Sequence, residues 1–216
     1  DQFGSSVAGL GDLDGDGVPD MAGAAIGDDT GASGTGAVYV LFMIANGTVK
    51  SSQKIGRQTG GGPTLAAGDE FGSLLTSLGD INADGVPDLA VGAASDDTGS
   101  FNAGAAYVLL MNTSGTAKSV SKIASNTNGG PPLDSSDQFG RSLARISDLN
   151  DNGAIELAVG TPGDDTGGTD RGAVHVLFLK LMPLVTVTVA PAVVDEAGTP
   201  SLIYTFSRTG DTAAPL

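Results

Sequence analysis

Cysteine and tryptophan are absent from this sequence of 216 residues, and histidine occurs once, at His175. Without cysteine there can be no disulfide bonds, so the folded chain must be stabilised by its core or by bound ions. Soft metal ligands are missing as well, which makes zinc, iron and copper centres poor candidates. No run of apolar residues approaches the roughly 18 residues that a membrane-spanning helix needs.

Basic residues are scarce, because 10 lysines and arginines face 25 aspartates and glutamates, for a net charge of −15. This charge argues against nucleic acid or an anionic membrane surface as a partner. Glycine is abundant, with 34 residues, and segments with helical periodicity are absent. Short apolar runs between glycine-rich turns are typical of an all-β protein with many short strands.

The sequence repeats with a constant step of 68 residues, seen first in the pairs Phe3-Gly4, Phe71-Gly72 and Phe139-Gly140. The same step separates the members of three other sets: the acidic loops 12–20, 80–88 and 148–156, the aspartate pairs 28–29, 96–97 and 164–165, and the apolar segments 36–42, 104–110 and 172–178. Three copies of one supersecondary unit explain this pattern most simply.

Each unit is predicted to contain four strands, which in the first unit cover residues 3–13, 20–26, 36–43 and 48–55. Tandem four-stranded antiparallel units are typical of the blades of a β-propeller. Antiparallel pairing then places the acidic loops on one side of the propeller and the aspartate pairs on the other. We therefore expect an all-β fold with three four-stranded antiparallel blades of a partial β-propeller: blade 1 (1–68), blade 2 (69–136) and blade 3 (137–182).

Each acidic loop has oxygen-bearing side chains at positions 1, 3, 5 and 9 and a glycine at position 6. This spacing suits a hard cation, because alternate side chains turn inward, the glycine allows a sharp turn and the carbonyl of position 7 can add an oxygen. Calcium fits better than magnesium, which demands strict octahedral geometry. The predicted ligands are Asp12, Asp14, Asp16, Val18 and Asp20 in loop 1; Asp80, Asn82, Asp84, Val86 and Asp88 in loop 2; and Asp148, Asn150, Asn152, Ala154 and Glu156 in loop 3.

Turn formation is the alternative explanation, because aspartate, asparagine and glycine also build ordinary hairpin turns. Two near-complete copies in one register favour metal binding in loops 1 and 2. Loop 3 retains only Asp148 and Glu156 as charged ligands, so both interpretations stay open there.

The order of Phe-Gly, D-x-D-x-D-G-x-x-D, an alanine- and glycine-rich strand and Gly-Ala-Val-Tyr-Val resembles the FG-GAP repeat of integrin alpha-subunit propellers and of many bacterial secreted proteins. The resemblance implies calcium on the lower face of a seven-bladed propeller and a protein or cell-surface ligand on the upper face. It also implies an extracellular, secreted or cell-surface location. The chain departs from the family in two ways: three blades cannot close such a ring, and the family's Gly-Ala-Pro survives only in altered form, at 23–25, 92–94 and 160–162.

Residues 183–216 leave the repeat. The segment 185–189 alternates strictly between valine and threonine, as an exposed strand does. The segments 191–198 and 204–211 resemble the opening of a Calx-beta sandwich, in which Glu196 takes an early acidic position. We expect here the start of a truncated β-sandwich-like domain, and the chain, which opens inside the repeat pattern without Met, is expected to be a piece of something longer.

The aspartate pairs are the residues that most resemble acid–base machinery. Catalysis would require the two carboxylates of a pair to differ in environment and to have a nucleophile or base nearby, whereas identical recurrence favours a structural turn. His175 falls where the other units have Tyr39 and Tyr107, so it is interpreted as a strand residue.

These patterns favour a calcium-binding, non-catalytic propeller segment of an extracellular or cell-surface protein that mediates adhesion or protein–protein contact. The alternative is an accessory, calcium-stabilised propeller of a larger secreted enzyme, with its catalytic residues outside this sequence. A propeller that uses the aspartate pairs for catalysis is a third hypothesis.

Overall fold

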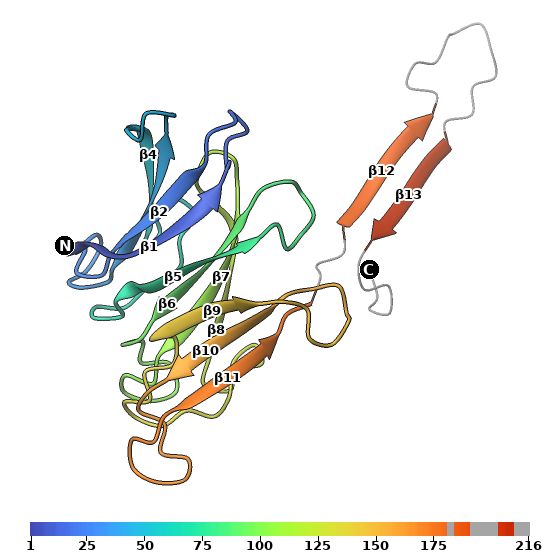
Figure 1. Cartoon of the computed structure of the whole chain (residues 1–216). Helices are drawn as coiled ribbons and strands as arrows, with labels where there is room; N and C mark the ends of the chain where they lie inside the picture. Colours follow the sequence, from blue (N-terminus) through green and yellow to red (C-terminus); the bar gives the residue numbers. More distant parts are fainter. Residues whose placement is uncertain (181–183, 191–202, 210–216) are drawn as a thin grey trace, which may run out of the picture.

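The computed structural model describes residues 1–180, 184–190 and 203–209, and it contains strands but no helix in these ranges. Figure 1 shows the three blades following one another in chain order. The strands of blade 1 are β1 (Phe3–Gly11), β2 (Asp20–Ala25), β3 (Ala37–Met43) and β4 (Val49–Gly56). Those of blade 2 are β5 (Phe71–Gly79), β6 (Asp88–Ala93), β7 (Ala105–Met111) and β8 (Ala117–Ala124). They are followed by β9 (Ser142–Ile146), β10 (Glu156–Thr161), β11 (Ala173–Phe178), β12 (Leu184–Ala190) and β13 (Ile203–Thr209).

Blades 1 and 2 are four-stranded antiparallel sheets in the order β1-β2-β3-β4 and β5-β6-β7-β8, as the repeat predicts. Blade 3 differs, because its sheet has three strands in the order β11-β10-β9. In blades 1 and 2 the fourth strand follows a hairpin turn at Gly47 or Gly115, each with positive φ. The segment one repeat after β8 contains β12, which pairs with β13 and not with β11.

Strands β12 and β13 form a separate antiparallel pair. The two strands fall within the segment predicted to start a Calx-beta-like domain. Much of that prediction, including Glu196 and the rest of 191–202, lies outside the described residues. The Calx-beta assignment therefore stays a prediction. The described part of the chain also contains no helix that could span a membrane.

The core lies between blades rather than inside a single sheet. Alternate residues of β3 point toward blade 2. Val38 and Val40 are therefore fully buried, in the same core cluster as Phe71 and Tyr107 of blade 2. A second cluster joins blades 2 and 3 and includes Phe139 and Leu157. Because β2, β6 and β10 lie between two other strands and face neighbouring blades, they are built from small or apolar residues that allow close packing.

Glycine is required where one blade meets the next. Gly36 and Gly104 have φ of +78° and +88° and form isolated bridges with Phe71 and Phe139 of the following blade. A Cβ at either glycine would overlap the phenylalanine backbone. The Phe71 amide also donates to the carbonyl of Thr35 at 3.0 Å. The Phe-Gly motif is thus a contact between blades.

Candidate metal centre

Acidic loop 1 connects β1 to β2 and is organised by the carboxylate of Asp12. Its Oδ1 accepts hydrogen bonds from the amides of Gly15 (2.8 Å) and Asp16 (3.0 Å), and its Oδ2 accepts one from Gly17 (2.8 Å). Gly15 and Gly17 have positive φ, which lets the loop wrap around this side chain. Asp12, the first residue of the motif, therefore holds the loop backbone in its conformation through these three hydrogen bonds.

Three carboxylates of loop 1 come together in the way that a cation site needs. Asp12, Asp14 and Asp20 each have an oxygen, and these three atoms all lie within 4.8 Å of one another. Among the described residues this is the one group of three such ligand-type side chains that meets this distance. Asp16, which the sequence also assigns to the site, directs one oxygen to the amide of Val18 at 2.9 Å.

A lysine from the neighbouring hairpin already brings positive charge to loop 1. The Lys50 ammonium on β4 lies 2.7 Å from Asp14 Oδ2 and also pairs with Asp16 Oδ2. These contacts lower the pKa of Asp16, with the Lys50 hydrogen bond as the main cause and the Val18 amide as the next. The same two carboxylates raise the pKa of Lys50 well above its ordinary value. The spacing of residues within the loop does not predict this lysine, which comes from another strand.

Loop 2 repeats this arrangement with one amide in place of a carboxylate. Asp80 accepts hydrogen bonds from the amides of Asp84 (3.1 Å) and Gly85 (2.8 Å), and Asn82 Nδ2 donates to Asp84 Oδ2 at 3.0 Å. Lys118 of β8 pairs with Asp84. Burial raises the pKa of Asp84, but the Lys118 and Val86 hydrogen bonds outweigh it, so the net shift is downward.

Loop 3 keeps the backbone shape of the other two but has fewer charges. Asp148 accepts hydrogen bonds from the amides of Asn152 (3.2 Å) and Gly153 (2.7 Å). Asn152 donates through Nδ2 to the carbonyl of Leu179 at 3.2 Å, so this side chain is partly engaged with the backbone. The structure thus favours a turn in loop 3 at least as well as a metal site.

The acidic residue at position 9 is buried and links the loop to the sheet. Asp20 accepts hydrogen bonds from the amides of Leu13 (3.0 Å) and Met43 (2.9 Å). Asp88 accepts the corresponding bonds from Ile81 (3.0 Å) and Met111 (2.9 Å). Burial raises the pKa of Asp88. Each carboxylate oxygen has a second lone pair, so this structural role leaves room for metal coordination.

Glu156 occupies position 9 in loop 3 and fits less well. Its Oε2 accepts a hydrogen bond from the Leu149 amide at 2.7 Å, but its Oε1 is buried without a hydrogen-bond partner. Glu156 thus accepts one amide hydrogen bond where Asp20 and Asp88 each accept two. Val18, Val86 and Ala154, assigned to the site through their carbonyls, lie partly or fully buried within their loops.

At the opposite ends of the sheets, the aspartate pairs form turns, as predicted. Asp96 accepts hydrogen bonds from the Thr98 amide (2.9 Å) and from the Tyr107 hydroxyl (3.0 Å), and it pairs with Lys122 at 2.6 Å. Asp97 accepts a hydrogen bond from the Asn102 amide at 2.8 Å. Asp28-Asp29 and Asp164-Asp165 make matching turns.

His175 lies on β11, opposite Val159 on β10, so it is a strand residue as expected. Its ring packs against Phe139 with centroids 5.8 Å apart, at the position where Tyr107 packs against Phe71, but tilted at 56° where the Tyr107 pair is edge-to-face.

Comparison with known proteins agrees with this geometry. The FG-GAP repeat family matches residues 3–41 and 71–109. The chain is 37% identical over 162 residues to integrin alpha-PS5 of Drosophila melanogaster and 33% identical over 175 residues to human integrin alpha-11. These alignments cover 74% and 75% of the chain but only 15% and 13% of the relatives. Residues 3–41 and 71–109, in the first two blades, thus match the FG-GAP repeat, and the chain is similar to a short part of the integrin alpha subunits.

Proposed function

We propose that this chain is a calcium-binding, non-catalytic β-propeller segment of an extracellular or cell-surface protein that takes part in adhesion or protein–protein contact. The observation that carries the calcium proposal is loop 1, where oxygens of Asp12, Asp14 and Asp20 converge within 4.8 Å. Such a set of hard oxygen ligands on a glycine-containing loop suits calcium.

A second observation also supports the binding of a cation by loop 1. The loop already accepts the ammonium of Lys50 between Asp14 and Asp16, which indicates a place of strongly negative potential. In this proposal Asp12, Asp14, Asp16 and Asp20 supply carboxylate oxygens and Val18 supplies its carbonyl. Bound calcium would supply the positive charge that relieves repulsion among these carboxylates.

Loop 2 forms the second proposed site, with Asp80, Asn82, Asp84 and Asp88 as side-chain ligands and the Val86 carbonyl. Its hydrogen bonds follow those of loop 1 almost one for one. Loop 3 is the weakest candidate, because Asn150 and Asn152 replace two carboxylates and because its acidic residue at position 9 is a glutamate.

Two arguments support the proposed extracellular location, the expected strength of the calcium sites and the similarity to integrin alpha subunits. Small exposed calcium loops bind at the weak end of the range, about 10⁻⁴ to 10⁻³ M, and fill where calcium is abundant. The similarity to integrin alpha subunits supports an adhesion role. We propose that the protein or cell-surface ligand docks on the side opposite the calcium loops, where the aspartate-pair turns lie.

Isothermal titration calorimetry with calcium tests this proposal. We expect two sites in the unmodified chain, one site in Asp12→Ala and one in Asp80→Ala. Asp97→Ala is the matched control, because it removes an exposed aspartate at the opposite end of blade 2. The proposal is wrong if the number of sites is the same in all four proteins.

A further inference from the structure

Two lysines on the edge strands β4 and β8 of blades 1 and 2 reach the acidic loops of their own blades. Lys50 of β4 pairs with Asp14 and Asp16 of loop 1, and its Nζ lies 2.7 Å from Asp14 Oδ2. Lys118 of β8 pairs with Asp84 of loop 2. Each lysine comes 34 residues after the aspartate at position 5 of its loop. The chain therefore builds the same contact between an ammonium and an acidic loop twice.

The lysines pair with carboxylate oxygens that the loop backbone does not use. Asp16 Oδ1 accepts a hydrogen bond from the Val18 amide at 2.9 Å, whereas Asp16 Oδ2 pairs with Lys50. Asp84 divides its oxygens in the same way, with Oδ1 bonded to a loop amide and Oδ2 paired with Lys118. These two Oδ2 atoms accept no hydrogen bond from a backbone amide of the described residues, which makes them the oxygens that a cation in the loop would bind. The ammonium and a metal ion would therefore compete for the same atoms.

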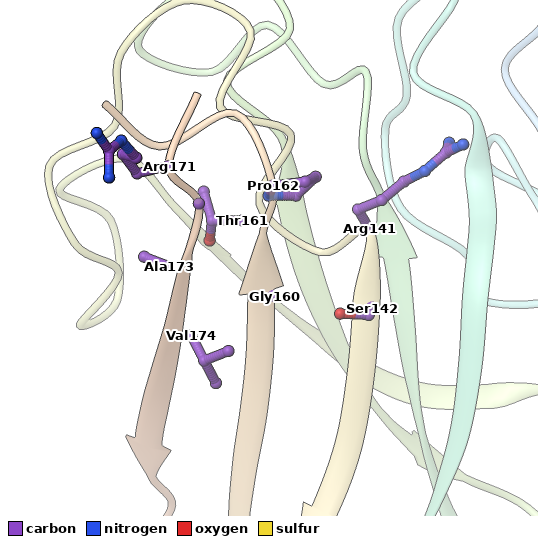
Figure 2. Close-up of a pocket in the computed structure, with 9 residues that line it drawn as sticks. Arg141, Ser142, Gly160, Thr161, Pro162, Arg171, Ala173 and Val174 are labelled. Atoms are coloured by element: carbon purple, nitrogen blue, oxygen red, sulfur yellow. The ribbon is translucent and has the colours of Figure 1, made fainter. Parts of the chain in front are cut away.

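Loop 3 has neither the aspartate nor the lysine. Position 5 of this loop is Asn152, and the position of the lysine in the repeat holds Thr186. The ion pairs of the described residues include none with loop 3. Two arginines of blade 3, Arg141 and Arg171, line a pocket beside Thr161, at the end of β10 opposite to loop 3 (Figure 2). The lysine thus occurs in the two units whose loop has a carboxylate at position 5 and is absent from the unit whose loop has an amide there.

We propose that Lys50 and Lys118 are internal cations that calcium displaces, so that each ammonium pairs with its loop when calcium is scarce and leaves when the ion binds. This inference rests on the calcium binding proposed above for loops 1 and 2. The two cations exclude each other, because both need the same oxygens and like charges at such short range repel. Each lysine therefore weakens calcium binding by its own loop, and by linkage calcium weakens the lysine contact by the same factor.

The exchange has two consequences for blades 1 and 2. Repulsion among the loop carboxylates is reduced in both states, by the ammonium at low calcium and by the ion at high calcium. The blades should therefore stay folded over a wide range of calcium concentration. Calcium must also displace an ammonium before it binds, so the loops fill only where calcium is abundant, which agrees with the proposed extracellular location.

An ordinary surface ion pair is the alternative explanation. The side chains of Lys50 and Lys118 are 34% and 46% exposed, and exposed ion pairs contribute little to stability. If the lysines form only such pairs, their removal changes stability by the same amount with and without calcium. If calcium displaces them, their removal costs stability only when calcium is absent.

Thermal unfolding of the unmodified chain and of Lys50→Met, each in excess chelator and in saturating calcium, tests the proposal. In chelator Lys50→Met should lower Tm by about 1–3 °C, and most of this loss should disappear in calcium. Lys54→Met is the matched control, because Lys54 lies on the same strand but pairs with Asp28 at the opposite end of the sheet. It should lower Tm equally in both conditions. Lys118→Met, compared with Lys122→Met, repeats the test in blade 2.

The outcomes distinguish the exchange from the calcium binding on which it rests. A loss of Tm that is confined to chelator for Lys50→Met and Lys118→Met supports the exchange. If calcium raises the Tm of the unmodified chain but the two variants lose the same Tm in both conditions, calcium binds and the exchange is overturned. If calcium changes the Tm of no variant and not that of the unmodified chain, the proposed calcium binding is wrong and the exchange is overturned with it.

Discussion

Replacing Asp88 with alanine separates the structural role of acidic loop 2 from the calcium binding proposed for it. The Asp88 carboxylate is fully buried and accepts hydrogen bonds from the amides of Ile81 and Met111. Alanine would leave both amides buried without a partner, at about 1–3 kcal/mol each, so we expect a loss of about 2–6 kcal/mol. For a protein of this size each kcal/mol lowers Tm by about 2–4 °C, so Tm should fall by at least roughly 4 °C.

The assay is thermal unfolding followed by circular dichroism, in excess chelator. Asp80→Ala is the matched control, because Asp80 is exposed and its amide partners, Asp84 and Gly85, can bond to water instead. In chelator Asp88→Ala should therefore lower Tm much more than Asp80→Ala does. Asp88→Asn should fall between them, since it keeps one acceptor oxygen. Equal losses for Asp88→Ala and Asp80→Ala would refute the structural role.

Three other changes have definite expected outcomes. Burial raises the pKa of Asp69 to about 6, so its charge costs stability once the pH rises through that value. Asp69→Asn should therefore raise the free energy of unfolding at about pH 8 by up to about 3 kcal/mol, and Tm should rise with it. The gain should vanish at about pH 4. Lys50→Met should tighten calcium binding at loop 1 a few-fold in calorimetry, because the metal no longer displaces an ammonium from Asp14; unchanged affinity would contradict this. Gly104→Ala should unfold in far less denaturant than Gly47→Ala, whose added Cβ meets nothing within 4 Å; equal midpoints would show that the blade junction tolerates a side chain there.

The sequence was sufficient to predict the strands of blades 1 and 2 to within about two residues at each boundary. Because the repeat step is a constant 68 residues, the strand boundaries predicted in one unit can be compared with those predicted in the other. The glycine turns mark the ends of the strands. Blade 3 was predicted less well, because its described sheet has three strands and the segment one repeat after β8 contains β12, which pairs with β13. The repeat period predicts a strand at that position but does not predict its partner.

The loops were predicted as acidic turns suited to a cation, and the structure adds two features that local spacing does not contain. The burial of Asp20 and Asp88 depends on their bonds to Met43 and Met111, which lie 23 residues further along the chain. Lys50 reaches Asp14 from a strand 36 residues away. Its recurrence as Lys118, one repeat later, is the sequence signal by which it could have been found.

The most direct test of the central claim is a thermal melt of the whole chain in millimolar calcium and again in excess chelator. Millimolar calcium is about 1 to 10 times a Kd of about 10⁻⁴ to 10⁻³ M, so each site adds roughly 0.4–1.4 kcal/mol and two sites predict an upward shift of a few degrees. Asp12→Ala combined with Asp80→Ala should abolish this shift. An identical Tm with and without calcium in the unmodified chain would contradict the claim and would make the aspartates turn residues alone.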